Sequence, residues 1–372
     1  MKIRAVFDSF APYEWEISPR EIAKRANIPV SKVLRLDTNT SPFVPKKWLG
    51  KLAKNLVNLP VNQYPDTKYT EITQEVAKYC KVDLNNIVIT NGADEAIDII
   101  VKTLLDCRDK VILATPSYPM FRIASEIAGA KVIGIDRKEK PLFADDIDEM
   151  IRVGKKEKAS AVFLANPNNP TGTFLDIKEI NRLAEEIDCG IIVDEAYYEY
   201  CGRSAVELIK QHPNVIIIRT FSKAFSLAGE RIGCILANKW TVDKFNYVRP
   251  PNSLSVTSLE LALIALSDVK QIKKWVKEVI SERERCFSIL KSIDGVTPYP
   301  SVANFILFRL SIIKADYVHQ ELLEKGISIR NLNSVKKLKN CLRVTIGSRK
   351  DNNRFMKEFK RIVESGHKKV LY

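Results

Sequence analysis

Residues 220–233 read TFSKAFSLAGERIG and directly follow the apolar run Val215–Ile218. An apolar run of this length predicts a buried strand, so Lys223 is expected just beyond its end, beside the hydroxyl group of Ser222. Burial and a nearby cation lower the pKa of a lysine, and its free amine then attacks carbonyl groups. Arg231 follows among glycines, and its planar guanidinium suits a phosphate group. The stretch predicts a reactive lysine beside an anion site, although an ordinary strand-to-helix turn with a solvated lysine stays open.

The sequence around this stretch alternates between apolar runs of strand length and helical patterns. The runs lie at 87–89, 111–114, 131–135, 161–164, 190–193, 215–218 and 232–236. Helical patterns, for example at 93–105 and 177–187, separate most of them. This alternation predicts an α/β fold with a seven-stranded, mostly parallel sheet that is covered by helices on both faces. Ligands of such sheets bind at the carboxyl ends of the strands.

The rest of the chain predicts a second, smaller unit. Residues 258–293 have the pattern of long helices, and apolar runs at 304–308, 326–330 and 341–346 precede a closing helix at 352–364. We therefore predict three parts: an N-terminal segment (1–44) that packs against the small domain, a large domain (45–250), and a small α+β domain (251–372).

The chain has 372 residues, and its 59 Lys and Arg against 45 Asp and Glu give a net charge of +14. Such a surplus can indicate nucleic acid, a membrane surface, or small phosphorylated anions. The basic residues are scattered, so we expect mainly solvated helix faces, and neither a nucleic-acid nor a membrane partner. Residues 19–34 suggest two short helices around a turn, as at the start of a DNA-binding helix-turn-helix, but no third helix follows.

Cysteine and histidine usage argues against disulfides and metal sites. The seven cysteines contain no C-x-x-C pair, and the three histidines have no metal-ligand spacing. We expect free thiols in a reducing compartment. The first ten residues lack the apolar core of a signal peptide, and no apolar run is long enough to span a bilayer. The expected location is the cytoplasm.

Polar residues follow several of the predicted strands. A helix begins after Gly92, and its free amide groups could bind an anion. Tyr118 could stack on a flat ring, and the turn-forming sequence NPNNPTG would hold Asn169 rigidly. Asp194 ends an all-apolar strand and needs a cationic partner, such as a protonated pyridine nitrogen, while Tyr197 could donate to a phenolic oxygen. Each feature alone could be an ordinary cap, turn or loop, but together they indicate pyridoxal phosphate.

Four motifs resemble the fold-type I pyridoxal-phosphate enzymes of the aminotransferase class I and II family. They are NPNNPTG (166–172), DEAY (194–197), SKAF (222–225) and Arg231. The resemblance implies the fold of the aspartate aminotransferase-like, pyridoxal-phosphate-dependent transferases. Within the family the likeness is to histidinol-phosphate aminotransferases, and it is carried by YPD (64–66), NGADE (91–95), RPPN (249–252), GISIR (326–330) and CLRVTIG (341–347).

The resemblance implies pyridoxal 5'-phosphate as cofactor and assigns roles around its ring. Lys223 would form a Schiff base with the aldehyde and would later carry protons. Asp194 would pair with the ring nitrogen, Tyr197 and Asn169 would hold the phenolic oxygen, and Tyr118 would stack on the ring. The implied catalytic residues are Lys223, Asp194 and Tyr197.

Further residues are implied for the phosphate and the substrate. The cofactor phosphate would be surrounded by Ala93, Asp94, Glu95, Ser222 and Arg231, with Tyr64 reaching in from the second subunit of a homodimer. Asn39 and Arg343 would hold the carboxylate region of the substrate, and Arg330 its distal phosphate or carboxylate.

The implied activity is amino transfer between histidinol phosphate and 2-oxoglutarate, in histidine biosynthesis. Thr40-Ser41 stand where the family usually has Glu-Asn, Glu230 precedes Arg231, and Cys234 replaces a common aromatic residue. The first departure lies near the substrate, so alternatives stay open: a decarboxylase of threonine phosphate or a related amino acid, and an aminotransferase for aromatic or other amino acids. A non-enzyme alternative is a DNA-binding regulator that senses pyridoxal phosphate.

Overall fold

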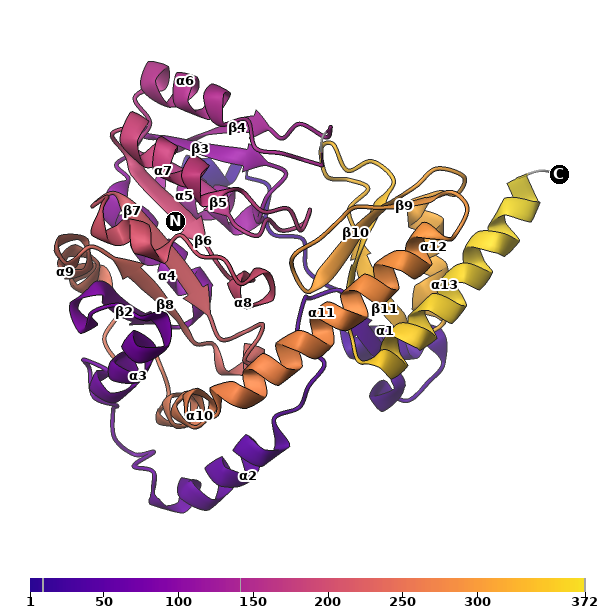
Figure 1. The fold of residues 1–372 in the computed structure, drawn as a ribbon, viewed down its shortest axis with the longest axis horizontal. Helices are drawn as coiled ribbons and strands as arrows, with labels where there is room; N and C mark the ends of the chain where they lie inside the picture. Colours follow the sequence, from indigo (N-terminus) through magenta and orange to yellow (C-terminus); the bar gives the residue numbers. More distant parts are fainter. Residues whose placement is uncertain (9, 141, 371–372) are drawn as a thin grey trace.

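The computed structural model of the chain describes residues 1–8, 10–140 and 142–370. These residues form two β-sheets, each with helices packed around it (Figure 1). The larger sheet has seven strands in the order β2-β8-β7-β6-β5-β3-β4, and the smaller has five in the order β1-β11-β12-β10-β9. The predicted fold class is confirmed by this arrangement.

The seven predicted strands all form, and all belong to the larger sheet. Their bounds are β2 Ile87–Thr90, β3 Lys110–Thr115, β4 Lys131–Asp136, β5 Ala161–Ala165, β6 Gly190–Asp194, β7 Val215–Thr220 and β8 Gly233–Ala237. Strands β3 to β7 run parallel, whereas β8 is antiparallel to both of its neighbours, β2 and β7. Asp194 is paired with Ala165 on β5 and with Ile218 on β7. The carboxyl ends of these three central strands therefore meet at one edge.

The central strands are apolar throughout because helices cover both faces of the sheet. Along β6, Ile191 and Val193 belong to one buried cluster and Ile192 to another, as the two-residue repeat of a strand requires. One face is covered by α4 (Gly92–Leu104), α5 (Pro119–Ala128) and α9 (Lys239–Val248). The other is covered by α3 (Thr70–Cys80), α6 (Ile147–Glu157), α7 (Ile177–Glu186) and α10 (Val256–Leu266).

The smaller sheet combines residues from both ends of the chain. Its strands are β1 Leu34–Leu36, β9 Val296–Pro298, β10 Phe305–Leu310, β11 Ile327–Asn331 and β12 Cys341–Thr345. The helices near it are α1 (Pro19–Ala26), α11 (Val269–Lys291), α12 (Ala315–Glu324) and α13 (Arg349–Val370). In Figure 1, the long helix α11 runs from the region of the larger sheet to that of the smaller one. The three domain boundaries stay predictions, although β1 brings the N-terminal segment into this sheet.

The prediction of two short helices in residues 19–34 is wrong in its second half. Helix α1 forms as expected, since Ser18 caps its N-terminus by accepting a hydrogen bond from the Glu21 amide and Pro19 is its first residue. After Pro29, however, only a single 3₁₀ turn forms, at Val30–Lys32. The next residues become β1, which pairs in parallel with β11. A helix-turn-helix is therefore not formed there.

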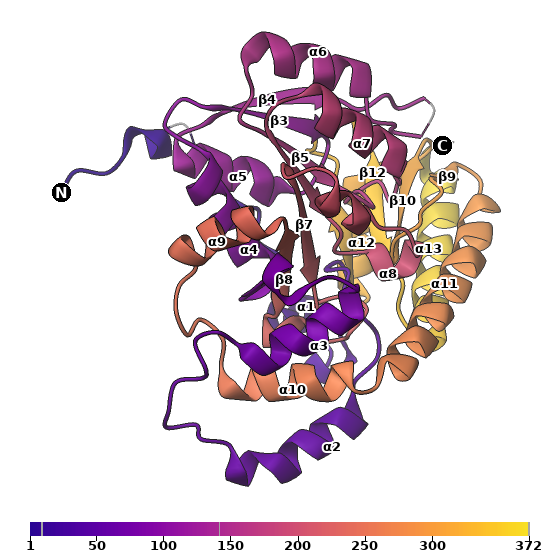
Figure 2. The same cartoon turned by 60° about the vertical axis from the view of Figure 1, so that its left-hand side comes forward.

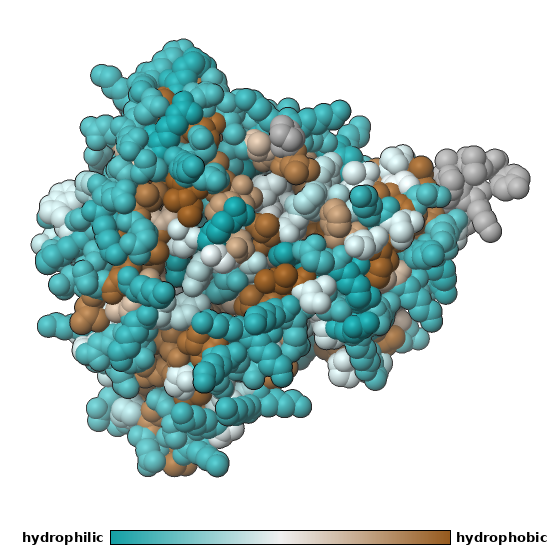
Figure 3. Space-filling view, viewed as in Figure 1, coloured by the Kyte–Doolittle hydropathy of each residue, from teal (hydrophilic) through white to brown (hydrophobic). Residues whose placement is uncertain are grey.

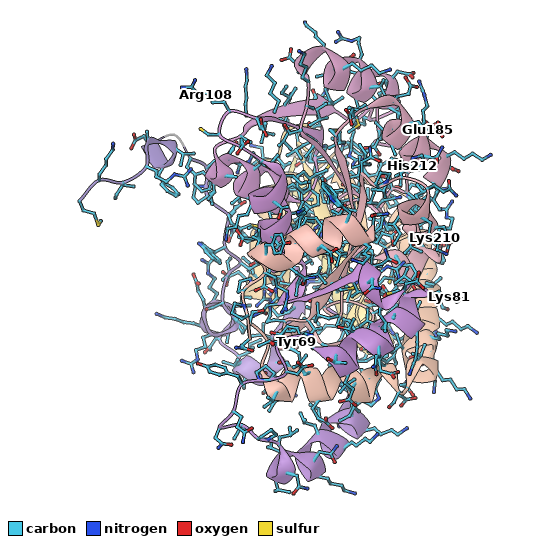
Figure 4. All side chains as sticks on the ribbon, turned by 90° about the vertical axis from the view of Figure 1, so that its left-hand side faces the viewer. Tyr69, Lys81, Arg108, Glu185, Lys210 and His212 are labelled. Atoms are coloured by element: carbon cyan, nitrogen blue, oxygen red, sulfur yellow. The ribbon has the colours of Figure 1, made fainter. Side chains whose placement is uncertain are left out.

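The remaining helices lie at one end of the larger sheet or connect its strands. Helix α2 (Lys46–Asn55) packs on α10, which also contacts α3, and Figure 2 shows the three side by side. Tyr69 and Lys81, labelled in Figure 4, flank α3 at its two ends, and both have left-handed backbone conformations. The short helix α8 is formed by Tyr198–Cys201. Figure 2 also shows residues 1–8 extending away from the rest of the molecule.

Hydrophilic side chains cover most of the face shown in Figure 3. In the part of the chain that the structure describes, no helix is both long and apolar enough to cross a membrane.

Candidate active site

A cavity of about 470 Å³ opens where the carboxyl ends of β5, β6 and β7 face the smaller sheet and the N-terminal segment. Residues predicted for the cofactor and the substrate line it together: Asn39, Ala93, Asp94, Tyr118, Asn169, Asp194, Tyr197, Ser222, Lys223, Arg231, Arg330 and Arg343. They come from both sheets and from segments far apart in the sequence, so the fold assembles one site from them.

Lys223 follows β7 by three residues, and its side chain reaches back to the N-terminal segment. Its Nζ donates a hydrogen bond to the main-chain oxygen of Thr38, at 3.2 Å. Burial and, to a smaller extent, the positive charge of Arg343 together lower the pKa of Lys223 to about 8. A lysine in this state is partly unprotonated near neutral pH, as a nucleophile or a general base requires.

Asp194 ends the neighbouring strand β6, and its residue surface is only 6% exposed. Burial raises its pKa to about 7, although the amide of Ala196 donates a hydrogen bond to its Oδ1 at 3.0 Å. A buried carboxylate without a matched cation is costly. Asp194 lines the cavity, so a cationic group bound beside it there would favour the ionised form.

Arg343, on β12, orients the polar side chains between the two sheets. It is buried, and it donates to the side-chain oxygen of Asn169 and to the main-chain oxygen of Asp37. Its Nε has no hydrogen-bond partner among the described residues. Because the oxygen of Asn169 is occupied by Arg343, the NH₂ group of Asn169 is free to donate elsewhere. Similarly, Asn39 donates to the hydroxyl oxygen of Tyr197 at 2.9 Å, which leaves the Tyr197 proton available.

A cradle for an anion lies at the N-terminus of α4. Gly92 has a φ of +78°, and a Cβ atom on it would lie 2.9 Å from Nη2 of Arg231. A Cβ atom on Gly233 would lie 2.7 Å from the main-chain carbonyl carbon of Gly92. Only glycines let the guanidinium and the helix terminus approach so closely. Arg231 also reaches Ser222 at 3.5 Å. Amide groups, a hydroxyl and a guanidinium are donors suited to a phosphate, so these residues fit that of pyridoxal phosphate.

Asp94 brings a negative charge to the edge of this cradle. Its carboxylate lies 3.2 Å from Nη2 of Arg231 and accepts a hydrogen bond from the hydroxyl of Tyr118 at 2.9 Å. Burial and Asp94 raise the pKa of Tyr118 far above its ordinary value. The tyrosine therefore stays protonated, and its ring is held at the cavity wall.

Sequence reasoning missed the contribution of residues 12–16. Pro12, Tyr13, Glu14 and Glu16 line the cavity, and the Glu16 carboxylate lies 3.2 Å from Nη1 of Arg330. These residues lie in an irregular segment with no motif or periodicity, so their position depends on tertiary structure alone.

Two predicted cofactor residues lie outside the cavity lining. Tyr64 is 84% exposed on the surface of the single chain. The Glu95 carboxylate accepts hydrogen bonds from the Asn91 amide and from the Ser253 hydroxyl at 3.1 Å. Glu95 therefore stabilises the start of α4 with its side chain. The predicted contacts of both residues with the cofactor stay predictions.

Known proteins resemble this chain in sequence and in fold. The chain matches the family aminotransferase class I and II over residues 31–359. A histidinol-phosphate aminotransferase from Ruminiclostridium cellulolyticum is 35% identical over 359 residues, or 96% of each chain. The crystal structure of histidinol-phosphate aminotransferase from Sinorhizobium meliloti in complex with pyridoxal-5'-phosphate has a TM-score of 0.87 at 25% identity, covering 98% of both chains. That of L-threonine-O-3-phosphate decarboxylase from Porphyromonas gingivalis has a TM-score of 0.78 at 26% identity, covering 89% of this chain and 100% of the other.

The chain belongs to the aminotransferase class I and II family, and it is a pyridoxal-phosphate-dependent aminotransferase. The predicted family, enzyme class and cofactor are confirmed.

Proposed function

We propose that this aminotransferase catalyses reversible amino transfer between L-histidinol phosphate and 2-oxoglutarate, as a step of histidine biosynthesis. The observation that carries the proposal is the pairing of Arg330 on β11 with Arg343 on β12. Both residues line the cavity that contains Lys223. Residues directly opposite each other on antiparallel strands have Cβ atoms about 5 Å apart on one face of the sheet. Two guanidinium groups can therefore approach the same ligand.

The chemistry of histidinol phosphate suits this pair. The compound has no carboxylate; its amine-bearing carbon carries a CH₂–O–phosphate arm instead. A phosphate carries about −1.5 to −2 charges at neutral pH and three acceptor oxygens, so it can bind two arginines at once. The relatives named histidinol-phosphate aminotransferase support this substrate. Glutamate and 2-oxoglutarate would place a carboxylate on Arg343, which lines the cavity.

When bound, pyridoxal phosphate supplies an electron-withdrawing ring that stabilises negative charge on the amine-bearing carbon of the substrate. In our proposal Asp194 binds the ring nitrogen, Tyr197 and Asn169 donate to the phenolic oxygen, and Tyr118 lies against the ring. The orientation of Asn169 by Arg343 and of Tyr197 by Asn39 supports these roles.

Lys223 would take a proton from the amine-bearing carbon and return it to a neighbouring atom. A general base works best when its pKa lies near the working pH, and burial brings the pKa of Lys223 to about 8. The hydrogen bond from Nζ to Thr38 holds this amine inside the cavity.

A single-turnover experiment tests the proposed substrate. The holoenzyme is mixed with excess L-histidinol phosphate without any keto acid, and we expect one equivalent of imidazole acetol phosphate per active site. Adding 2-oxoglutarate then yields glutamate and allows a second turnover. If histidinol phosphate gives no keto product while glutamate alone still forms 2-oxoglutarate, then the enzyme acts on a different substrate.

Decarboxylation of a phospho-amino acid is a second candidate, favoured by the structural likeness to the threonine-phosphate decarboxylase. Both reactions would use Lys223 and a phosphate-binding arginine. Carbon dioxide released from L-threonine phosphate at rates above those of histidinol-phosphate turnover would favour this second function.

We further propose a homodimer located in the cytoplasm. Tyr64 and three nearby apolar residues, Leu56, Val57 and Val61, are exposed on the single chain, which supports a covering subunit. Each of the seven cysteines lies in the described residues, and none forms a disulfide, which supports a reducing compartment.

A further inference from the structure

Residues 11–18, which we name the N-terminal strap, cover one side of the cavity. The strap is anchored at its two ends: Nη2 of Arg122 donates to the main-chain oxygen of Ala11 at 2.7 Å, and Ser18 caps α1. Between these anchors, the strap's hydrogen bonds to other described residues both come from Arg330. The middle of the strap is therefore held by a residue of the proposed substrate site.

Arg330 makes two contacts with the strap. Its Nη1 lies 3.2 Å from the carboxylate of Glu16, and its Nη2 donates to the main-chain oxygen of Glu14, also at 3.2 Å. The hydroxyl of Tyr13 donates to the same Glu16 oxygen at 2.8 Å. The Arg330 and Glu16 side chains are 18% and 25% exposed. Glu16 thus presents to Arg330 the kind of oxygen anion that a substrate would present.

We propose that Glu16 is an internal competitor for Arg330, which the anionic group of the substrate must displace before it binds. The inference rests on the proposed function, because it concerns the arginine that would bind the substrate phosphate. A phosphate can replace the Glu16 carboxylate with a larger charge and more acceptor oxygens. A substrate that brings no anionic group to Arg330 leaves Glu16 in place and finds that part of the cavity closed.

Competition of this kind acts as a filter on substrates. The apparent affinity for an anion is the intrinsic affinity multiplied by the fraction of molecules in which Arg330 is not paired with Glu16. Ligands that bind Arg330 strongly overcome this reduction, whereas uncharged side chains, such as those of aromatic amino acids, gain nothing from displacing Glu16.

The test compares phosphate binding to the holoenzymes of the wild type, Glu16→Gln and Glu14→Gln. Inorganic phosphate is the probe, and calorimetry measures its dissociation constant while the cofactor occupies the cradle at α4. We expect Glu16→Gln to bind phosphate roughly 3- to 10-fold more tightly, since one ion pair is lost. Glu14→Gln removes the same charge two residues away but keeps the main-chain oxygen that contacts Arg330, so its affinity should equal that of the wild type.

Arg330→Gln completes the comparison. In an Arg330→Gln background, Glu16→Gln should give no gain, because the two residues act on each other. The proposal is overturned if Glu16→Gln binds phosphate no better than the wild type, if Glu14→Gln gains equally, or if the gain persists without Arg330. Should Arg330→Gln fail to fold, the comparison of Glu16→Gln with Glu14→Gln still decides.

Turnover separates this inference from the proposed substrate. With L-histidinol phosphate, Glu16→Gln should lower KM by a similar factor and leave kcat unchanged. If no variant, wild type included, converts histidinol phosphate, then the proposed substrate is wrong, whereas the phosphate titration still accepts or rejects the role of Glu16.

Discussion

Lys223 differs from a surface lysine because of its surroundings. It follows a strand whose six residues are all buried, and Arg343 brings a second positive charge into the same cavity. Both effects lower its pKa to about 8, against an ordinary value of 10.5. The sequence predicted this environment from the apolar run before Lys223, because a buried strand places the next residues at the edge of the sheet.

Replacing Lys223 should make the apoprotein more stable at neutral pH. Between pH 8 and 10.5 the unfolded chain binds more protons than the folded chain, so stability rises with pH in this range. Below about pH 8 the buried amine is charged, and its burial lowers the free energy of unfolding by the full amount. This cost vanishes as the pH rises to 10.5. We expect Lys223→Met to gain about 2–3 kcal/mol at pH 7 and nothing at pH 11. Urea unfolding at the two pH values measures the difference, and equal stability at pH 7 would contradict the lowered pKa.

At this scale the sequence predicted the residues that lie in motifs, but not those placed by tertiary structure. Asp194 and Asn169 follow strands, so the edge of the sheet brings them together. Glu16 and Tyr13 lie in an irregular segment and reach the cavity only because β1 draws the N-terminal residues beside β11. Nothing in the local pattern of residues 11–18 encodes that pairing.

Among the elements, the junction of β8 with α4 depends on two glycines. Gly233 is paired with Thr90 on β2 and Thr220 on β7, and its Cα faces the main chain of Gly92. A side chain there would push the start of α4 away from Arg231. This close approach brings the guanidinium of Arg231 against the N-terminus of α4, where the phosphate cradle lies.

Gly233→Ala should therefore destabilise the protein and weaken its hold on the cofactor. The new Cβ would meet main-chain atoms of Gly92 and Arg219 at 2.7 and 2.8 Å, and such overpacking costs about 1–3 kcal/mol. Gly229→Ala is the control, because a Cβ there meets nothing within 4 Å, and its change should stay within about 0.5 kcal/mol. Urea unfolding and equilibrium dialysis of pyridoxal phosphate measure both effects; equal losses in the two variants would argue against the close approach.

Most elements of the larger sheet could be predicted, whereas several of the smaller sheet could not. The inner strands of the larger sheet contain continuous apolar runs, since both of their faces are buried, and the edge strand β4 is partly exposed. By contrast, β1 and β9 have three residues each, too few for a periodic pattern. The second predicted helix of residues 19–34 became a 3₁₀ turn and β1 because pairing with β11 outweighed a weak local helix signal.

The whole molecule places the cofactor side of the cavity on one sheet and the substrate side on the other. Asp194, Lys223 and Arg231 come from the larger sheet and the segments next to it, whereas Arg330 and Arg343 come from the smaller. The N-terminal strap crosses between them. Substrate binding therefore depends on how the two sheets are held together. Helix α11 and the segment before β1 both help to hold them.

A mixed-dimer experiment tests the proposed role of Tyr64 in the site of a second subunit. Dimers of the Lys223→Ala variant and of the Tyr64→Ala variant are dissociated mildly, mixed in equal amounts and allowed to reassociate. If Tyr64 acts on the neighbouring chain, half of the dimers regain one intact site, and activity should rise to about a quarter of the wild-type value. Activity no higher than the mean of the two parent variants would show that Tyr64 does not act in the site of a second subunit.

The most direct test of the account is to find which lysine holds the cofactor. The protein is loaded with pyridoxal phosphate and treated with borohydride, which fixes the link between the cofactor and an amine, and mass spectrometry of its peptides then locates the modified residue. We predict stoichiometric modification of Lys223, and its loss in Lys223→Ala but not in Asp194→Asn with excess cofactor. Stoichiometric modification of another lysine in the wild type, or none at all, would contradict the site described above.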